Sequence, residues 1–159
     1  MARVVVVCMA NVCRSPMAQA VLQHMAARER LSRRLHVGSA GVRVSWPGAR
    51  IDPRAEAALR RSGYACAPSR SRQITAADFE RLDLALAMDH SNLDALRELC
   101  PPEHAHKLRL FLDFAPERQG QAVPDPYYGD TRGFDNVLAL CEAGARGLIA
   151  TVARGEVFS

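Results

Sequence analysis

The sequence lacks the features that mark membrane, secreted and fibrous proteins. None of its apolar runs approaches the ~20 residues of a membrane-spanning helix, and the N-terminal apolar stretch is too short for a signal peptide. The five cysteines are an odd number without framework spacing, which disfavours a disulfide-stabilised secreted protein. With 48% hydrophobic residues, 10 Gly and 9 Pro, collagen-like and disordered classes are excluded. We therefore expect one folded domain over residues 1–159, a cytoplasmic location and no membrane partner.

Lysine is nearly absent, since 20 of the 21 basic residues are arginine and the formal net charge is +4. Residues 1–80 carry 13 Arg and 5 Asp or Glu, whereas residues 81–159 carry 8 basic and 12 acidic residues. The basic first half suits an anionic substrate. Because the arginines are scattered, with no run of five and no interleaved aromatic residues, we expect no nucleic-acid partner.

Short apolar runs alternate with helical patterns along the chain. The runs predict strands at Arg3–Cys8, Leu35–Ala40, Leu82–Met88 and Lys107–Leu112. The intervening segments predict helices beginning at Ser15-Pro16, from Asp52 to Ser62, at Ser91–Leu99 and from Gly133 to Ala153. A short capped turn or helix is predicted at Thr75–Phe79. A loop of roughly 20 residues precedes the last helix, and loops of that length are usually functional. This alternation predicts a doubly wound α/β fold, with about four parallel strands flanked by helices on both faces. Ligands of such folds bind at the carboxyl ends of the strands.

The segment from Cys8 to Ser15, with the sequence CMANVCRS, lies at such a strand end and directly before a helix. Its successive backbone N–H groups can form a concave anion site at the helix N-terminus. Arg14 can hold two oxygens of a tetrahedral oxyanion, and the positive field favours the nucleophilic thiolate of Cys8. Ser15 can donate to the sulfur, and Asn11 tolerates the left-handed backbone that a tight loop needs. The alternative is that Cys8 is an inert, buried cysteine at a strand end.

A thiolate attack on a phosphate ester also needs an acid for the leaving oxygen. Asp125 is the candidate, because it stands between two prolines in the long loop and is followed by Tyr127 and Tyr128. The adjacent tyrosines can line the mouth of a pocket. An aspartate before a proline is also common in ordinary turns, so Asp125 alone does not establish the chemistry.

The two segments together resemble the low-molecular-weight protein tyrosine phosphatases. The similarity rests on Cys-x-x-Asn-x-Cys-Arg-Ser-Pro near the N-terminus and on Asp-Pro-Tyr-Tyr from Asp125. It extends over nearly the whole chain through Ser39-Ala40-Gly41, Trp46, Gly48, Asp52-Pro53-Arg54-Ala55, Ser71-Arg72-Gln73-Ile74, Met88-Asp89 and Asn92.

The resemblance implies hydrolysis of phosphotyrosine in two steps without a metal or other cofactor. Cys8 would form a phosphocysteine, Arg14 and the loop amides would stabilise the transition state, and Asp125 would act as acid and then as base. Residues expected to contact the substrate or its phosphate are Met9, Ala10, Asn11, Val12, Cys13, Ser15, Trp46, Tyr127 and Tyr128.

Cys13 would be able to trap Cys8 as a reversible disulfide, or it is simply a buried cysteine. The alternative for Trp46 is plain packing in the core or on the surface. Phosphate or vanadate would bind the site, and the partner would be a phosphotyrosine protein, a bacterial tyrosine kinase being one candidate.

Two positions depart from the family pattern. Ala10 stands where the family usually has glycine, which would strain the loop if that residue needs a positive φ. Ser69 stands where the family tends to have a histidine that braces the loop asparagine, so we expect Asn11 to depend more on Ser39.

Two other functions use the same scaffold. An arsenate reductase needs further cysteines close together to relay a disulfide, and neither Cys66 nor Cys100 has a second cysteine nearby in sequence. A non-catalytic phosphotyrosine-binding or anion-binding module would usually have lost the nucleophile or the acid, and both are present. The sequence therefore favours the phosphatase over these alternatives.

Overall fold

The four strands form one parallel sheet. The computed structural model describes residues 1–66, 68–127 and 129–156. The strands are β1 (Ala2–Cys8), β2 (Leu35–Gly41), β3 (Leu84–Ala87) and β4 (Leu108–Leu110), in the order β2-β1-β3-β4. Every pairing is parallel, and β1 lies between β2 and β3. The predicted doubly wound, four-stranded α/β fold is confirmed.

The run of four valines in β1 is buried on both faces of the sheet. Val4 and Val6 belong to one hydrophobic cluster, and Val5 and Val7 belong to another. Because side chains alternate along a strand, each pair faces a different layer of helices. The continuous apolar run, without a polar alternation, follows from this double burial.

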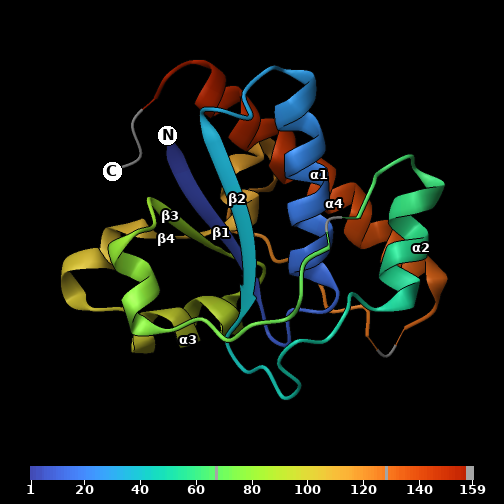
Figure 1. The fold of residues 1–159 in the computed structure, drawn as a ribbon, viewed down its shortest axis with the longest axis horizontal. Coiled ribbons are helices and arrows are strands. Elements are labelled where there is room, and N and C mark those ends of the chain that lie inside the picture. Colours follow the sequence, from blue (N-terminus) through green and yellow to red (C-terminus); the bar gives the residue numbers. More distant parts are fainter. Residues whose placement is uncertain (67, 128, 157–159) are drawn as a thin grey trace.

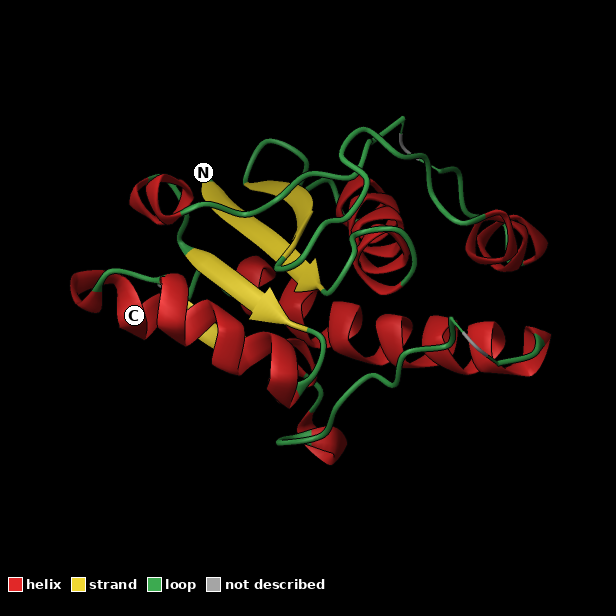
Figure 2. Cartoon of the chain, turned by 90° about the horizontal axis from the view of Figure 1, so that it is seen from below, coloured by secondary structure: helices red, strands yellow, loops and turns green. Residues whose placement is uncertain are grey.

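The helices cover the two faces of the sheet unequally. The helices α1 (Arg14–Arg28), α2 (Pro53–Arg61) and α4 (Thr131–Ala153) pack together on the face of Val4 and Val6. The opposite face is covered by α3 (His90–Leu99) and by the short 3₁₀ helix η1 (Ala76–Glu80). Figures 1 and 2 show the strands in the middle of the molecule with helices on both sides.

Several predicted boundaries differ from the structure. The strand predicted at Leu82–Met88 is confined to Leu84–Ala87, and the one predicted at Lys107–Leu112 is confined to Leu108–Leu110. The last helix begins at Thr131, two residues before the predicted start, because Asp130 caps it by accepting from the N–H groups of Arg132 and Gly133.

The 3₁₀ helix η4 (Pro116–Arg118) lies within the segment predicted to be one long loop, and η3 (Phe111–Phe114) spans the end of the strand predicted at Lys107–Leu112 and the start of that loop. Another 3₁₀ helix, η2 (Pro102–Lys107), precedes β4. The segment η3 packs closely on α4. A Cβ on Gly144 would lie 2.4 Å from the ring of Phe111, and one on Gly147 would lie 1.7 Å from the carbonyl oxygen of Phe114. Two glycines inside a helix therefore fix η3 in place, an effect that periodicity does not reveal.

Helix α4 is long and apolar enough, by length and composition alone, to cross a membrane, and it is the one such helix among the described residues. Half of its apolar window is buried inside the protein, where it packs against α1, α2 and η3. Packing of α4 in the protein core is therefore sufficient to explain why the helix is so apolar.

The parallel strands point their carboxyl ends toward one edge of the molecule. In Figure 1 this edge is at the bottom, where the loops after β1 and β2 meet the orange segment that leads into α4. The segments containing Cys8, Trp46 and Asp125 therefore gather at one place, as the topology of such sheets requires.

Candidate active site

Residues 9–13 form a tight loop between the end of β1 and the start of α1. The loop is fastened to the segment after β2, because Val42 N–H donates to the Cys8 carbonyl at 3.0 Å and Arg43 N–H donates to the Met9 carbonyl at 2.9 Å. Gly41 permits this close approach, since a Cβ there would lie 2.6 Å from the Met9 oxygen.

Asn11 holds the loop in its strained shape. Its φ is +59°, in the left-handed region that asparagine tolerates better than most residues. Its Nδ2 donates to Ser15 Oγ at 2.8 Å and to Ser39 Oγ at 3.0 Å, while its Oδ1 accepts from Arg72 N–H at 3.0 Å. The side chains of Asn11 and Ser39 are thus in direct contact, as expected from the sequence.

Cys8 lies at the bottom of the loop, and 3% of it is exposed. Its Sγ is 3.0 Å from Ser15 Oγ. Helix α1 begins immediately beyond, with no side-chain cap on its first N–H groups and no acidic residue in its first turn. Unsatisfied N–H groups and the positive end of the helix dipole therefore face the site, which suits an anionic thiolate and an oxyanion.

Arg14 is buried and held from two directions. Its Nη1 donates to Asp89 Oδ2 at 2.6 Å and to the Val123 carbonyl at 3.0 Å. Its Nη2 lies 3.6 Å from Asp125 Oδ2. These contacts fix the plane of the guanidinium group beside Cys8, at the carboxyl edge of the sheet.

Asp125 is the more exposed carboxylate of the site, since 41% of its side chain is accessible. Its Oδ1 accepts from Tyr127 N–H at 3.0 Å, which fixes the carboxyl group within its own turn. Arg54 steadies this turn by donating to the Tyr127 carbonyl at 2.9 Å and by lying over the Tyr127 ring. Asp125, the acid expected from the sequence, therefore lies in a turn that these contacts hold in place.

One pocket of about 420 Å³ contains these groups. Its lining residues are Cys8, Met9, Ala10, Val12, Cys13, Arg14, Ser45, Trp46, Asp125 and Tyr127. Trp46 is 79% exposed, so it stands at the rim and is not a core residue. Ser71 holds the Trp46 loop by donating from Oγ to the Trp46 carbonyl at 2.6 Å.

The two cysteines of the loop differ in environment. Burial, followed by the nearby charge of Asp52, raises the pKa of the Cys13 thiol to about 12. Cys13 therefore remains protonated at neutral pH. Of the other cysteines, burial also raises the pKa of Cys66, Cys100 and Cys141, as expected for residues outside the site.

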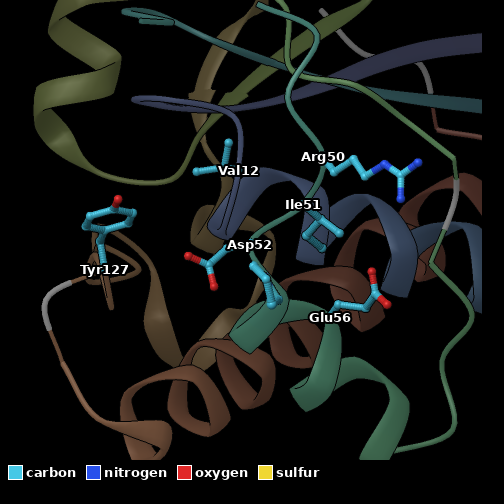
Figure 3. A pocket seen from close by; sticks show the side chains of 7 residues that line it. Val12, Arg50, Ile51, Asp52, Glu56 and Tyr127 are labelled. Atoms are coloured by element: carbon cyan, nitrogen blue, oxygen red, sulfur yellow. The ribbon is translucent and has the colours of Figure 1, made fainter. Parts of the chain in front are cut away.

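A second hollow, of about 500 Å³, lies beyond Val12 and Tyr127 (Figure 3). It is lined by Arg50, Ile51, Asp52, Pro53 and Glu56 in addition to those two residues. Asp52 is paired with Arg54 at 2.9 Å, and although burial opposes the shift, hydrogen bonds from Arg54 hold the pKa of Asp52 below its usual value. The hollow has no nucleophile, so the chemistry belongs to the pocket of Cys8.

The structure brings together all the predicted site residues that it describes. Met9, Ala10, Val12, Cys13, Trp46 and Tyr127 line the Cys8 pocket, and Asn11, Ser15 and Ser39 form the hydrogen-bonded support behind it. Tyr128, also predicted to contact substrate, lies outside the described residues.

Sequence reasoning did not assign Asp89, Arg54 or Arg72 to the site. A signal for Asp89 was available, because it follows a buried strand directly and begins a helix as its cap.

The comparison with protein families agrees with this geometry. Residues 3–157 match the model of the low molecular weight phosphotyrosine protein phosphatases. The chain belongs to this family.

Curated relatives support the membership over nearly the full length. A low molecular weight protein-tyrosine-phosphatase of Streptomyces coelicolor is 42% identical over 153 residues, covering 94% of this chain and 93% of the relative. The phosphatase of Sus scrofa is 34% identical, with 94% of each chain covered. The chain is accordingly a phosphoric monoester hydrolase of the protein tyrosine phosphatase type.

Solved structures give the same fold. The low molecular weight phosphatase VcLMWPTP-2 of Vibrio cholerae superposes with a TM-score of 0.92 at 37% identity, covering 99% of this chain and 100% of that one. YwlE, described as an arginine phosphatase, superposes with a TM-score of 0.85 at 28% identity, covering 96% of each chain. The family fold therefore also occurs in an enzyme named for a different phosphorylated amino acid.

Proposed function

We propose that this phosphatase hydrolyses phosphotyrosine in proteins through a covalent intermediate on Cys8, with Arg14 and Asp125 as its other catalytic residues. The observation that supports these roles is their convergence in one pocket: the sulfur lies at its base, the buried guanidinium beside it and a half-exposed carboxylate above. Each group has the chemistry that its step requires.

In the first step, the Cys8 thiolate attacks phosphorus as the bond to the tyrosine oxygen breaks. Asp125 supplies the proton that the leaving phenolate takes up. In the second step, Asp125 accepts a proton from water, the water oxygen bonds to phosphorus, and the phosphorus–sulfur bond breaks. Ser15, 3.0 Å from the sulfur, stabilises the departing thiolate, and both steps proceed without a metal ion.

The rim of the pocket favours an aromatic phosphate ester. Trp46 and Tyr127 both line it, and both rings are exposed enough to contact a substrate ring. Phosphate and vanadate are the simplest ligands for the loop. A relative from Vibrio vulnificus, Wzb, is described in complex with benzylphosphonate, an aromatic ligand of related shape.

The partner we propose is a cytoplasmic protein that carries phosphotyrosine, and a tyrosine kinase phosphorylated on its own tyrosines is one candidate. We further propose that residues 1–159 act as a single catalytic unit. The reversible Cys8–Cys13 disulfide remains a proposal as well. In this reaction a peroxide would oxidise the Cys8 thiolate to a sulfenic acid, and the Cys13 sulfur would then displace water from it to form the disulfide. The raised pKa of Cys13 makes its thiolate scarce and therefore slows this second step.

The first experiment is hydrolysis of p-nitrophenyl phosphate at pH 5–7 with EDTA, by the wild type and by Cys8→Ser. We expect metal-independent turnover that the variant loses, with vanadate binding retained. Asp125→Asn should slow phosphotyrosine peptides more than p-nitrophenyl phosphate, because the poorer leaving group needs the acid more. A Cys8→Ser protein with wild-type turnover would refute the mechanism. Faster hydrolysis of phosphoarginine than of phosphotyrosine would refute the substrate class.

A further inference from the structure

Behind the catalytic loop, Gln19 is a polar side chain of α1 with 7% of its surface exposed. Its Oε1 accepts from Ser39 Oγ at 2.7 Å, and its Nε2 lies 3.4 Å from the Val37 carbonyl. A buried amide that satisfies both of its ends is oriented by its surroundings. The reverse orientation would place Oε1 against the Val37 carbonyl oxygen.

Gln19 is joined to Cys8 by a continuous series of hydrogen bonds. Ser39 accepts from Asn11 Nδ2, the same Nδ2 donates to Ser15 Oγ, and Ser15 Oγ lies 3.0 Å from the Cys8 sulfur. All five side chains are buried.

The direction of these hydrogen bonds is set at the Gln19 end. Ser39 has one hydroxyl hydrogen, and because it gives this hydrogen to Gln19 Oε1, its lone pairs face Asn11. Asn11 can then use both hydrogens of Nδ2 as donors, one to Ser39 and one to Ser15. With a lone pair of Ser15 occupied by Asn11, the one hydroxyl hydrogen of Ser15 has two acceptors within reach, the Cys8 sulfur at 3.0 Å and the Ala40 carbonyl at 3.4 Å. The sulfur is the nearer of the two, and a thiolate is the stronger acceptor because it is charged.

We propose that Gln19 is a positioning residue for catalysis: it fixes the orientation of Ser39 and, through Asn11 and Ser15, the hydrogen bond to the sulfur of Cys8. It touches neither substrate nor the reacting atoms. The inference rests on the proposed function, in which Ser15 stabilises the thiolate that leaves phosphocysteine. Without the acceptor at Gln19, the Ser39 hydroxyl can turn toward Asn11 and disturb the whole series.

The test compares Gln19→Met with Gln23→Met. Methionine keeps the length of glutamine and removes the acceptor. Gln23 lies one turn further along α1 and also donates to the Val37 carbonyl, at 3.3 Å, but has no hydrogen bond to Ser39. We expect kcat for p-nitrophenyl phosphate to fall about three- to tenfold in Gln19→Met, the rate equivalent of one hydrogen bond, with KM unchanged. Gln23→Met should keep the wild-type kcat.

A second comparison separates positioning from simple loss of packing. The neutral acid of Gln19→Glu keeps an acceptor for Ser39 and a donor toward the Val37 carbonyl, so it should recover part of the lost kcat at the acidic end of the assay range. Gln19→Asn is too short to reach Ser39 and should not recover it. In a Ser39→Ala background, Gln19→Met should have no further effect on kcat, because the Ser39 hydroxyl that joins Gln19 to Asn11 is already absent. Equal losses in Gln19→Met and Gln23→Met, or additive losses with Ser39→Ala, would overturn the proposal.

Alkylation of Cys8 by iodoacetate at pH 6 provides a readout that needs no turnover. We expect slower alkylation in Gln19→Met, since the thiolate loses support from Ser15. Absence of phosphatase activity in the wild type would refute the proposed function. The alkylation rates would still decide the role of Gln19, because they do not depend on turnover. Identical alkylation rates in Gln19→Met, Gln23→Met and the wild type would sink the role of Gln19 alone.

Discussion

At the scale of single residues, the site depends on two carboxylates that hold Arg14 in different ways. Asp89 makes a short contact of 2.6 Å and its side chain is 23% exposed, whereas Asp125 lies 3.6 Å away and is 41% exposed. The first carboxylate therefore holds the guanidinium group, and the second is available for the proton transfer that we propose. Two carboxylates beside one arginine can in this way have separate tasks.

Asp89→Asn should lower kcat/KM about ten- to hundredfold, because it removes the negative charge from a short, partly buried hydrogen bond to Arg14. Asparagine caps helices as well as aspartate does, so α3 should remain intact. The control is Asp83→Asn. Asp83 directly precedes β3, whereas Asp89 follows it, and the Asp83 carboxylate accepts from Arg3 N–H at 2.7 Å. Steady-state kinetics and the inhibition constant of phosphate measure the effect. Equal kcat/KM in both variants would contradict the assigned task of Asp89.

The sequence predicts which residues form the catalytic loop better than it predicts the backbone strain in the loop or the distant residues that support it. The order of Cys8, Asn11 and Arg14 predicted a tight loop between a strand and a helix, and the structure has the loop there. The concern that Ala10 would strain the loop is removed, because Asn11 and Arg30 are the non-glycine residues with positive φ in the described chain. The contact between Arg72 N–H and Asn11 joins positions 61 residues apart, and no local pattern encodes it.

At the scale of elements, the catalytic loop depends on how closely β2 approaches it. Gly41 ends β2, and its α-hydrogen side faces Met9 and Asn11 of the loop. Gly38 lies three residues earlier in the same strand, where a Cβ would meet no atom within 4 Å. Both glycines lie in β2, but a methyl group would clash with the Met9 carbonyl at Gly41 and with no atom at Gly38.

We expect Gly41→Ala to lower kcat/KM at least about tenfold and to destabilise the protein by roughly 1–3 kcal/mol, since the Met9 carbonyl must move away from the new methyl group. Gly38→Ala should preserve activity and stability. Urea denaturation and kinetics on p-nitrophenyl phosphate provide the comparison. If Gly41→Ala matched Gly38→Ala in both measurements, the close packing of β2 against the loop would not matter for catalysis.

The sequence pattern identified the main helices and strands of the fold and the short capped segment that forms η1, but not the exact ends of the elements or the 3₁₀ helices η2, η3 and η4. The ends of β3 and β4 are set by pairing with neighbouring strands, which a single segment does not encode. The position of η3 is set by Gly144 and Gly147 of α4, which lie some 30 residues away in sequence and look unfavourable inside a helix.

At the scale of the whole molecule, buried acids set the pH range of stability. Burial raises the pKa of Cys13 to about 12 from an ordinary value of 9.0. Burial and the hydrogen bond to Glu142 raise the pKa of Tyr64 to about 12 from 10.0. At the acid end, hydrogen bonds with Thr75 and Arg72 outweigh the effect of burial and lower the pKa of Asp78. Stability is therefore expected to be high near neutral pH and to fall in both directions.

The alkaline side gives the most direct test. A group whose pKa is raised by folding stabilises the protein fully below its unfolded pKa and loses that effect as pH rises through its folded pKa. For Tyr64 this window runs from about pH 10 to about 12, with a slope of up to about 1.4 kcal/mol per pH unit. Tyr64→Phe should lower stability at pH 7, because it removes the 2.6 Å hydrogen bond to Glu142, but it should flatten the decline above pH 10. Urea denaturation at pH 7, 9, 10 and 11 in the presence of a thiol reductant measures both effects. An unchanged alkaline slope in the variant would show that Tyr64 ionises as readily in the folded protein as in the unfolded chain, and the decline would then belong to the buried thiols.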